Sequence, residues 1–337
     1  MALSDLIAAL MFLGVVAYAI FGGADFGTGT WDLTAGRGDR GDEVRAQIDR
    51  SLGPVWEANH VWLIYVLVFL WTGFPTVFVA IMNTLFIPWM FVALGIVLRG
   101  GAFAFRKFSS SYREAQIHGI IFAASSIITP FFLGMIAGAI ASGRVPLDSS
   151  GNVWTSWTGP TSWVGGVLAV LSCSFLAGTF LAADADRYGE PDLAVMIGRR
   201  VLVVGAVTGA AAIVAAVTLE LDAESLASGL HGPGLPLIIM SAVAGAFSLW
   251  RLANRRWARA RVGAVIAVAS IIIGWGVGQY PDLLVDQAEI SQVIGARSTQ
   301  IGLLIVFCLA AVTVIPALIW LYVLVNGKRW AADAGAH

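Results

Sequence analysis

Residues 54–71 read Pro-Val-Trp-Glu-Ala-Asn-His-Val-Trp-Leu-Ile-Tyr-Val-Leu-Val-Phe-Leu-Trp, and this stretch decides the fold. Pro54 suits the first turn of a helix, where its missing N–H costs nothing. The apolar run behind it predicts a membrane helix. Glu57 and His60 are three residues apart, so they share one face of that helix. At about 1.5 Å per residue they lie close to one membrane surface.

Composition agrees with a membrane protein. The chain is 58% hydrophobic and 12% charged, against about 25% charged in a typical soluble domain, and its mean hydropathy is +0.82. The basic residues fall in short loops and build no large patch, which excludes nucleic acid as a partner. Cys173 and Cys308 lie inside apolar runs, so we expect packing residues there and neither a disulfide nor a metal site.

The first apolar run is expected to be an uncleaved helix. No positive segment precedes Leu6, and Asp5 is the only early charge, whereas a signal peptide begins with basic residues. The sequence also contains no Cys-x-x-Cys-His haem-attachment motif, no Walker loop and no His-Glu-x-x-His. Redox or other difficult chemistry would therefore need a bound cofactor or a partner.

Nine apolar runs predict an all-α integral membrane protein with nine transmembrane helices. Their expected bounds are 4–23, 54–73, 76–98, 117–141, 162–183, 198–219, 235–252, 262–280 and 299–325. With nine spans, 18 of the 20 basic residues fall on one side of the membrane, and only Arg144 and Arg297 fall on the other. The positive-inside rule then places the N-terminus outside and the C-terminus in the cytoplasm.

A weak internal repeat divides the chain. Ala24-Asp25 closes the first span and Ala183-Asp184 closes the fifth, and each is followed by a polar stretch and a basic segment. Repeats four spans apart have the same orientation in the membrane. We therefore expect two four-helix bundles and a peripheral C-terminal helix. The expected divisions are a first bundle over 1–141, an outer loop over 142–161, a second bundle over 162–281, and a loop, ninth helix and cytoplasmic tail over 282–337.

Polar residues gather near the expected cytoplasmic surface. Asp25 ends the first span, Glu57 and His60 begin the second, Arg99 ends the third and His118 begins the fourth. Ionisable groups in or beside a span usually face the bundle interior or a water-filled path.

Simpler interpretations exist for some of these residues. Arg99 and His118 could be interfacial anchors, and Asp25 could cap a turn. Glu57 has no capping role after Pro54, so we expect it to be functional.

Three motifs resemble subunit II of the cytochrome bd quinol oxidases. They are Phe-Gly-Gly-Ala-Asp-Phe-Gly-Thr-Gly at 21–29, Trp-Asp-Leu at 31–33, and Pro-Val-Trp-Glu-Ala-Asn-His-Val-Trp-Leu at 54–63. The likeness continues through 74–75, Arg99 and 105–107; beyond the first third it rests on the number of spans and on Val-Ile-Pro at 314–316.

The resemblance implies a bacterial inner-membrane heterodimer. Its partner, subunit I, would carry haem b and haem d-type centres, oxidise quinol and reduce O2 to water, while subunit II holds no haem ligand. Small single-helix accessory subunits are compatible with this architecture. So is a menaquinone or ubiquinone molecule bound at subunit II.

The resemblance also implies roles for individual residues. Glu57 matches a carboxylate at the mouth of a cytoplasmic proton path, with Asp25 and His60 as its nearest partners. Trp56 and Arg99 would lie near a quinone, and Trp62 beside an oxygen entrance. This chain departs from the family where Asp is frequent at the position of Glu57 and Gln at the position of His60. A glutamate preserves the proton chemistry, and His60 would add a second titrating group.

A proton-coupled small-molecule transporter is the alternative, motivated by the repeat and the intramembrane carboxylates. Against it, no pair of Gly/Pro-broken helices meets at the expected midplane, where transporter substrate sites usually form.

For a redox subunit, small residues such as Gly134, Gly138 and Ala141 would pack closely against the partner.

Overall fold

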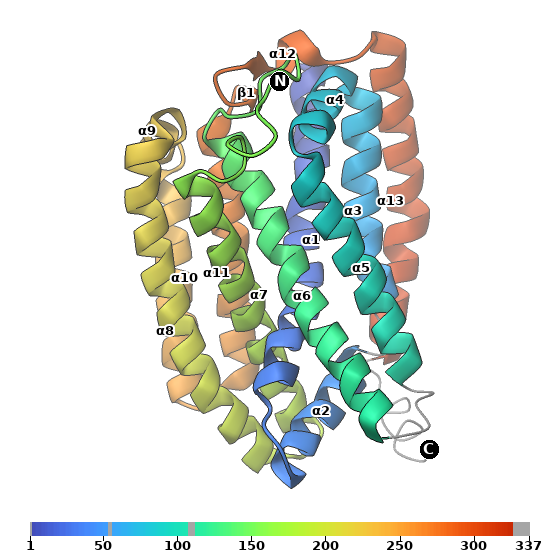
Figure 1. Ribbon diagram of the computed structural model, residues 1–337, viewed down its shortest axis with the longest axis vertical. Helices are drawn as coiled ribbons and strands as arrows, with labels where there is room; N and C mark the ends of the chain where they lie inside the picture. The colour runs from blue at the N-terminus through green and yellow to red at the C-terminus, as the bar shows by residue number, and fades with distance from the viewer. Residues whose placement is uncertain (1, 53–55, 107–111, 326–337) are drawn as a thin grey trace.

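The computed structural model describes residues 2–52, 56–106 and 112–325. The described chain is a bundle of long helices, with the N-terminus at one end and the last described residues of the chain near the other (Figure 1). The helices are α1 (Leu3–Thr34), α2 (Asp39–Leu52), α3 (Trp56–Gly73), α4 (Pro75–Thr84), α5 (Phe86–Arg106), α6 (Tyr112–Ala141), α7 (Pro160–Arg187), α8 (Pro191–Asp222), α9 (Glu224–His231), α10 (Leu235–Ala253), α11 (Trp257–Gln279), α12 (Ile290–Val293) and α13 (Arg297–Val325).

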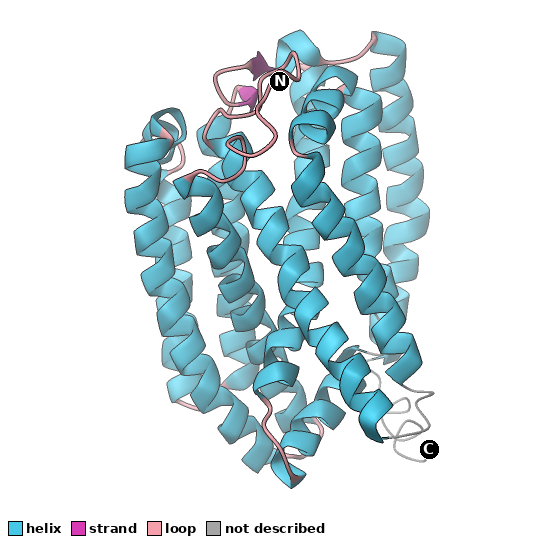
Figure 2. Cartoon of the chain, in the orientation of Figure 1, coloured by secondary structure: helices cyan, strands magenta, loops and turns pink. Residues whose placement is uncertain are grey.

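Two short strands, β1 (Asp282–Leu284) and β2 (Ala288–Glu289), form an antiparallel pair. They lie at the end of the bundle that also holds α4, α9 and α12 (Figures 1 and 2). We call this the outer end, after the expected topology, and the end that holds α2 the inner end.

Eight described helices are long and apolar enough to cross a membrane, and α3 with α4 makes a ninth if this bent pair is one span. The prediction of an all-α membrane protein is thus confirmed. Among the spanning helices is α10, the shortest of the predicted runs. The sidedness and the two-bundle division stay predictions.

The first span is longer than predicted. We expected a helix over 4–23 followed by a loop over 24–53, but α1 continues to Thr34 and α2 fills most of the remainder. Asp25 therefore lies inside α1 and not at its end. The amphipathic α2 lies against the inner end, with Val44 and Ile48 each 1% exposed in the same apolar cluster as Trp31.

The second and third spans are joined by a helix, not by the minimal turn expected at 74–75. Pro75 begins α4, which makes an angle of 118° with α3. The third span, α5, starts only at Phe86, so the predicted range 76–98 is wrong by about ten residues at its start. This shift moves Arg99 from the end of a span into its interior.

Glycines allow α7 to approach two other helices closely. A Cβ atom at residue 27 of α1 would lie 1.9 Å from the carbonyl oxygen of Cys173 on α7. On α6, a Cβ at Gly134 would lie 2.3 Å from the Gly165 carbonyl oxygen, and one at Gly138 would lie 2.6 Å from the Thr161 carbonyl oxygen. The expectation that Gly134 and Gly138 face a partner is therefore wrong, because they serve helix packing within the chain.

A salt bridge fastens the outer end. Arg144, in the segment between α6 and α7, pairs with Asp222 at the end of α8. The Asp222 carboxylate also accepts hydrogen bonds from the Thr161 backbone N–H (3.0 Å) and from its hydroxyl (2.6 Å). Asp222 thus satisfies one of the free N–H groups in the first turn of α7.

At the inner end, ion pairs hold the extramembrane segments. Arg45 of α2 donates to Asp32 of α1 at 3.0 Å, and Asp184 of α7 lies within 3.4 Å of Arg187 and 3.3 Å of Arg261. Asp184 is the residue that the proposed repeat equates with Asp25. The arginine partners of Asp184 are partly exposed, and they do not stand at the position that the repeat would equate with Arg99, the partner of Asp25. The repeat therefore stays a prediction.

Candidate functional site

A buried ion pair joins α1 to α5. The Arg99 Nη2 group donates to Asp25 Oδ1 at 2.7 Å and to the Asp25 backbone carbonyl at 3.3 Å. Arg99 is 1% exposed and Asp25 is 2% exposed. Arg99 is the largest of the described side chains that are almost fully buried. A charge this deeply buried persists only with a close partner, which each supplies to the other.

Neighbouring side chains fix the guanidinium in place. The Arg99 Nε donates to the Ser126 hydroxyl of α6 at 3.0 Å. Its central carbon lies 5.0 Å from the ring centroid of Phe26 and 5.1 Å from that of Phe122. Both distances permit a cation–π attraction, which is strongest where water is excluded. The arginine therefore ties together α1, α5 and α6.

The Asp25 carboxylate is only half satisfied. Its Oδ1 accepts from Arg99, whereas Oδ2 is buried and has no hydrogen-bond partner within the described part of the chain. Buried polar atoms are nearly always paired, so an open carboxylate oxygen in a spanning helix marks a place for water, a proton or another donor.

His60 of α3 lies beside this pair. Its ring centroid is 5.8 Å from that of Phe26 and 6.2 Å from that of Tyr18, both on α1. The Phe26 ring therefore contacts His60 as well as the Arg99 guanidinium. The neighbouring Asn59 is 4% exposed.

Trp56 and Glu57 are the first two residues of α3. Their side chains lie outside the described part of the structure, so the positions of the predicted proton acceptor and quinone contact are known only along the helix. Glu57 precedes His60 by three residues, which is less than one turn.

Trp62 packs among aromatic rings of three helices. Its ring is nearly parallel to that of Phe21, with 6.4 Å between centroids, and it meets Tyr65 edge-on at the same distance. Tyr65 in turn contacts Phe307 of α13 at 6.5 Å and donates from its hydroxyl to the Leu10 carbonyl at 2.8 Å. These rings form an apolar wall between α1, α3 and α13.

Comparison with known families identifies the chain. The family model described as cytochrome bd terminal oxidase subunit II matches residues 3–325. The chain belongs to this family.

Relatives and a solved structure agree with that assignment. This subunit II is 28% identical over 171 residues to the "Cytochrome bd ubiquinol oxidase subunit 2" of Bacillus subtilis (strain 168), which covers 50% of this chain and 48% of that protein. It is 26% identical over 221 residues to the "Putative cytochrome bd menaquinol oxidase subunit II" of the same strain, covering 64% and 62%. The matches thus span about half to three-fifths of these relatives.

The fold is similar to a chain of "The structure of bd oxidase from Geobacillus thermodenitrificans". The TM-score is 0.79 at 21% identity, over 97% of this chain and 99% of that one.

The buried pair corrects two expectations for this subunit II. Arg99 is not an interfacial anchor, because it lies in the interior of α5 and its charge is neutralised within the bundle. Asp25 is not a turn cap, because it lies inside α1. His118 lies apart from them near the start of α6, where its ring stacks on Phe105 at 5.9 Å.

Sequence reasoning missed Phe26, Phe122 and Ser126, the side chains that surround Arg99. Two signals were present. Phe26 follows Asp25 directly, and Ser125-Ser126 is a polar pair inside an apolar run. A hydroxyl in a spanning helix usually bonds to its own backbone or to a polar group on a neighbouring helix.

Side chains that could ligate a metal are few and scattered in the described part of the chain. No group of three or more His, Cys, Asp or Glu residues comes together among the described residues. Of the described histidines, His60 and His118 lie against aromatic rings, and the Nε2 atom of His231 pairs with Glu220 at 3.3 Å. Both cysteines are free thiols in apolar helices.

Proposed function

We propose that this subunit II works in a bd-type terminal oxidase complex of the bacterial inner membrane. Its partner, subunit I, would hold the haem groups at which quinol is oxidised and O2 is reduced to water. The family match across residues 3–325 carries this proposal. The names of the two relatives specify ubiquinol and menaquinol, so quinol is the supported substrate class and the quinone stays open between the two.

Within the complex, this chain would deliver protons from the cytoplasmic side. Reduction of O2 to water consumes protons, and they need polar groups along their way through the apolar bundle. Glu57 at the start of α3, then His60, then the open Oδ2 atom of Asp25 offer such a series. The observation that supports this role is the buried Asp25–Arg99 pair, with His60 packed on the same Phe26 ring.

Glu57 is the residue on which to test the path. We expect Glu57→Gln to assemble with normal haem spectra. It should turn over quinol at least about tenfold more slowly, because proton transfer through the carboxylate is lost. Glu57→Asp should keep most of the activity, because it retains a carboxylate. Quinol oxidase rates and proton uptake by the purified complex measure this. Full activity of an assembled Glu57→Gln complex would reduce Glu57 to a structural role.

The aromatic wall around Trp62 would serve as an O2 route. O2 partitions into apolar regions, and the rings of Phe21, Trp62 and Tyr65 line such a region between α1, α3 and α13. A polar replacement, Trp62→Gln, should raise the apparent KM for O2 without changing the haem spectra. Trp250→Gln, at an exposed tryptophan on α10, is the control. An unchanged KM for O2 in Trp62→Gln would contradict the proposed O2 route.

Two alternatives are separated by one measurement. The visible spectrum of the gently purified protein should show co-purified haem, whereas a colourless chain that moves a solute would indicate the transporter. The family match favours the oxidase subunit, and no observation on the described residues specifically favours the transporter. The quinone contact of Trp56 and Arg99 and the small accessory subunits stay predictions.

A further inference from the structure

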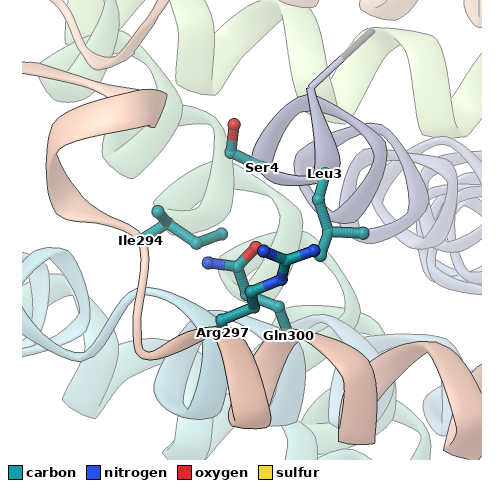
Figure 3. Close-up of a pocket in the computed structure, with 5 residues that line it drawn as sticks. All are labelled: Leu3, Ser4, Ile294, Arg297 and Gln300. Carbon is teal, nitrogen blue, oxygen red and sulfur yellow. The ribbon is translucent and has the colours of Figure 1, made fainter.

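A surface cavity at the outer end is lined by polar side chains that already bond elsewhere. Its volume is about 280 Å³, and its lining consists of Leu3, Ser4, Ile294, Arg297 and Gln300 (Figure 3). The Ser4 hydroxyl donates to the Asp5 carboxylate at 3.5 Å, and Gln300 Nε2 donates to the Gly295 carbonyl at 2.9 Å. None of these five described residues has a side-chain atom that is both buried and unpaired.

The Tyr18 hydroxyl on α1 is different, because it is both buried and unpaired. Tyr18 is 8% exposed. Its Oη atom, like Oδ2 of Asp25, has no hydrogen-bond partner among the residues that the structure describes. Buried polar atoms are nearly always paired. Two atoms on the same helix therefore each need a hydrogen-bond partner.

Tyr18, Gly22 and Asp25 lie on one stripe of α1. Residues four and seven positions apart share a face of a helix, so Gly22 stands between the other two. A Cβ atom at Gly22 would lie 2.8 Å from Cε2 of Tyr18, so the tyrosine ring uses space that a side chain would fill. Along the helix axis, Tyr18 and Asp25 are about 10 Å apart. Gly22 thus places no side chain between the hydroxyl and the carboxylate.

The hydroxyl belongs to the polar cluster around the ion pair. Tyr18 interacts electrostatically with both Asp25 and Arg99. Its ring meets that of Phe26 edge-on at 6.2 Å between centroids and lies 6.2 Å from that of His60. Tyr18 and Asp25, both in the described ranges, form no direct hydrogen bond with each other. A group that joins them must therefore be small and polar.

A water molecule fits both atoms. A carboxylate oxygen only accepts hydrogen bonds, whereas a hydroxyl both donates and accepts. Water can donate to Asp25 Oδ2 and bond to Tyr18 Oη at the same time, and buried waters typically make about three such bonds to otherwise unpaired groups. A cation is disfavoured, because the Arg99 guanidinium already lies 2.7 Å from the other carboxylate oxygen and would repel it.

We propose that Tyr18 and Asp25 hold an ordered water molecule beside Gly22, and that Tyr18 positions this water to give a proton to Asp25. A proton that arrives from the side of His60 binds to the water, and the water releases one of its own protons to Asp25 Oδ2. The water is thereby regenerated, and Tyr18 keeps its hydroxyl proton throughout. This role of Tyr18 rests on the proposed proton delivery, whereas the water site itself does not.

A cryo-EM map of the intact complex that resolves ordered waters tests the site. In the wild type, we expect density about 2.5–3.0 Å from both Tyr18 Oη and Asp25 Oδ2. Tyr18→Phe should remove this density, because the variant loses only the hydroxyl. The ring stays packed over Gly22, so the variant should assemble with wild-type haem spectra.

Turnover tests whether Tyr18 acts through the water. Tyr18→Phe should lower kcat for quinol oxidation about 10- to 100-fold, as expected when a reacting group is misplaced, and should leave KM for quinol and for O2 unchanged. The rate should also become more sensitive to D2O, because proton transfer then limits turnover, and a purely structural defect would not produce this change. Tyr280→Phe is the matched control, since it removes a tyrosine hydroxyl that is 57% exposed at the outer end. It should leave all of these quantities unchanged.

The site and the role of Tyr18 can fail separately from the proton path. A wild-type map without water density between the two atoms, or with a side chain of the partner there, would overturn the site. Wild-type kcat and D2O sensitivity in Tyr18→Phe, together with slow turnover in Glu57→Gln, would show that the path does not use this water. Full activity of both variants would refute the proton path itself and, with it, the role of Tyr18.

Discussion

Asp25 and Arg99 can be buried only as a pair, because each charge compensates the other. Removing one member of a buried pair typically costs about 3–5 kcal/mol, because the remaining charge is left uncompensated. The loss falls on the junction of α1, α5 and α6, where the two residues meet.

We therefore expect Asp25→Asn and Arg99→Gln each to lower the yield and the Tm of the assembled complex strongly. The double variant Asp25→Asn with Arg99→Gln removes both charges, so it should recover part of the loss, with a coupling energy of about 0.5–3 kcal/mol. Thermal unfolding of the three purified variants measures the cycle.

The pair formed by Asp184 and Arg261 is the matched control, because its arginine is 36% exposed. Breaking it should change stability by about 1 kcal/mol or less. If the two single variants at Asp25 and Arg99 proved additive in the double variant, the two charges would be independent, and the pair would not organise the junction.

The sequence located these residues in one region but missed their pairing. Hydropathy ends the first span near residue 23, because Gly22-Gly23-Ala24-Asp25 lowers the local apolar content. The helix continues because the Asp25 charge is compensated by Arg99, which lies 74 positions further along the chain. No local pattern contains that information.

At the scale of the helices, the contact of α1 with α7 depends on Gly27. A side chain there would meet a backbone atom, the Cys173 carbonyl, which cannot rotate away. Gly27→Ala should therefore push the two helices apart. The expected cost is about 1–3 kcal/mol, typical of overpacking, and it should appear as a lower Tm of the complex.

Gly209→Ala on α8 provides the comparison for that variant. No atom outside the local helix lies within 4 Å of the Cβ position there. This substitution should leave the Tm unchanged or raise it, since alanine favours a helix over glycine by about 1 kcal/mol. Equal Tm values for the Gly27 and Gly209 variants would show that the α1–α7 contact adapts.

Helix identity was predictable, but the connection between α3 and α5 was not. A run of apolar residues after Pro75 reads as the beginning of a span, whether the helix crosses the bilayer or bends along its surface. The 118° angle between α3 and α4 is set by tertiary packing, with Phe74 fully buried in the apolar cluster at the outer end. Hydropathy also failed to predict α2, which we expected to be a loop, because its apolar face is only a few residues wide.

At the scale of the whole molecule, exposed apolar surface does not by itself locate the partner subunit. Exposed leucine, isoleucine and valine side chains cover α8, α10 and α13. Lipid tails are as apolar as these residues, so such a surface is equally suited to lipid and to protein. We expect the chain to be unstable without a partner that covers part of this surface, and expressing it with and without subunit I tests this expectation.

The orientation of the whole molecule is open to a direct test. The nine-span topology predicted from the sequence counts 18 of the 20 basic residues on one side, and 17 remain there once Arg99 is placed inside α5. The positive-inside rule therefore puts α2 in the cytoplasm and the segment between α6 and α7 outside. In a variant with Cys173 and Cys308 replaced by alanine, Ser150→Cys should react with a membrane-impermeant maleimide in intact cells. Arg40→Cys on α2 should react only after the membrane is opened, and both positions are exposed in the described chain. The reverse labelling pattern would invert the molecule, and a cytoplasmic entrance for protons at Glu57 would then be untenable.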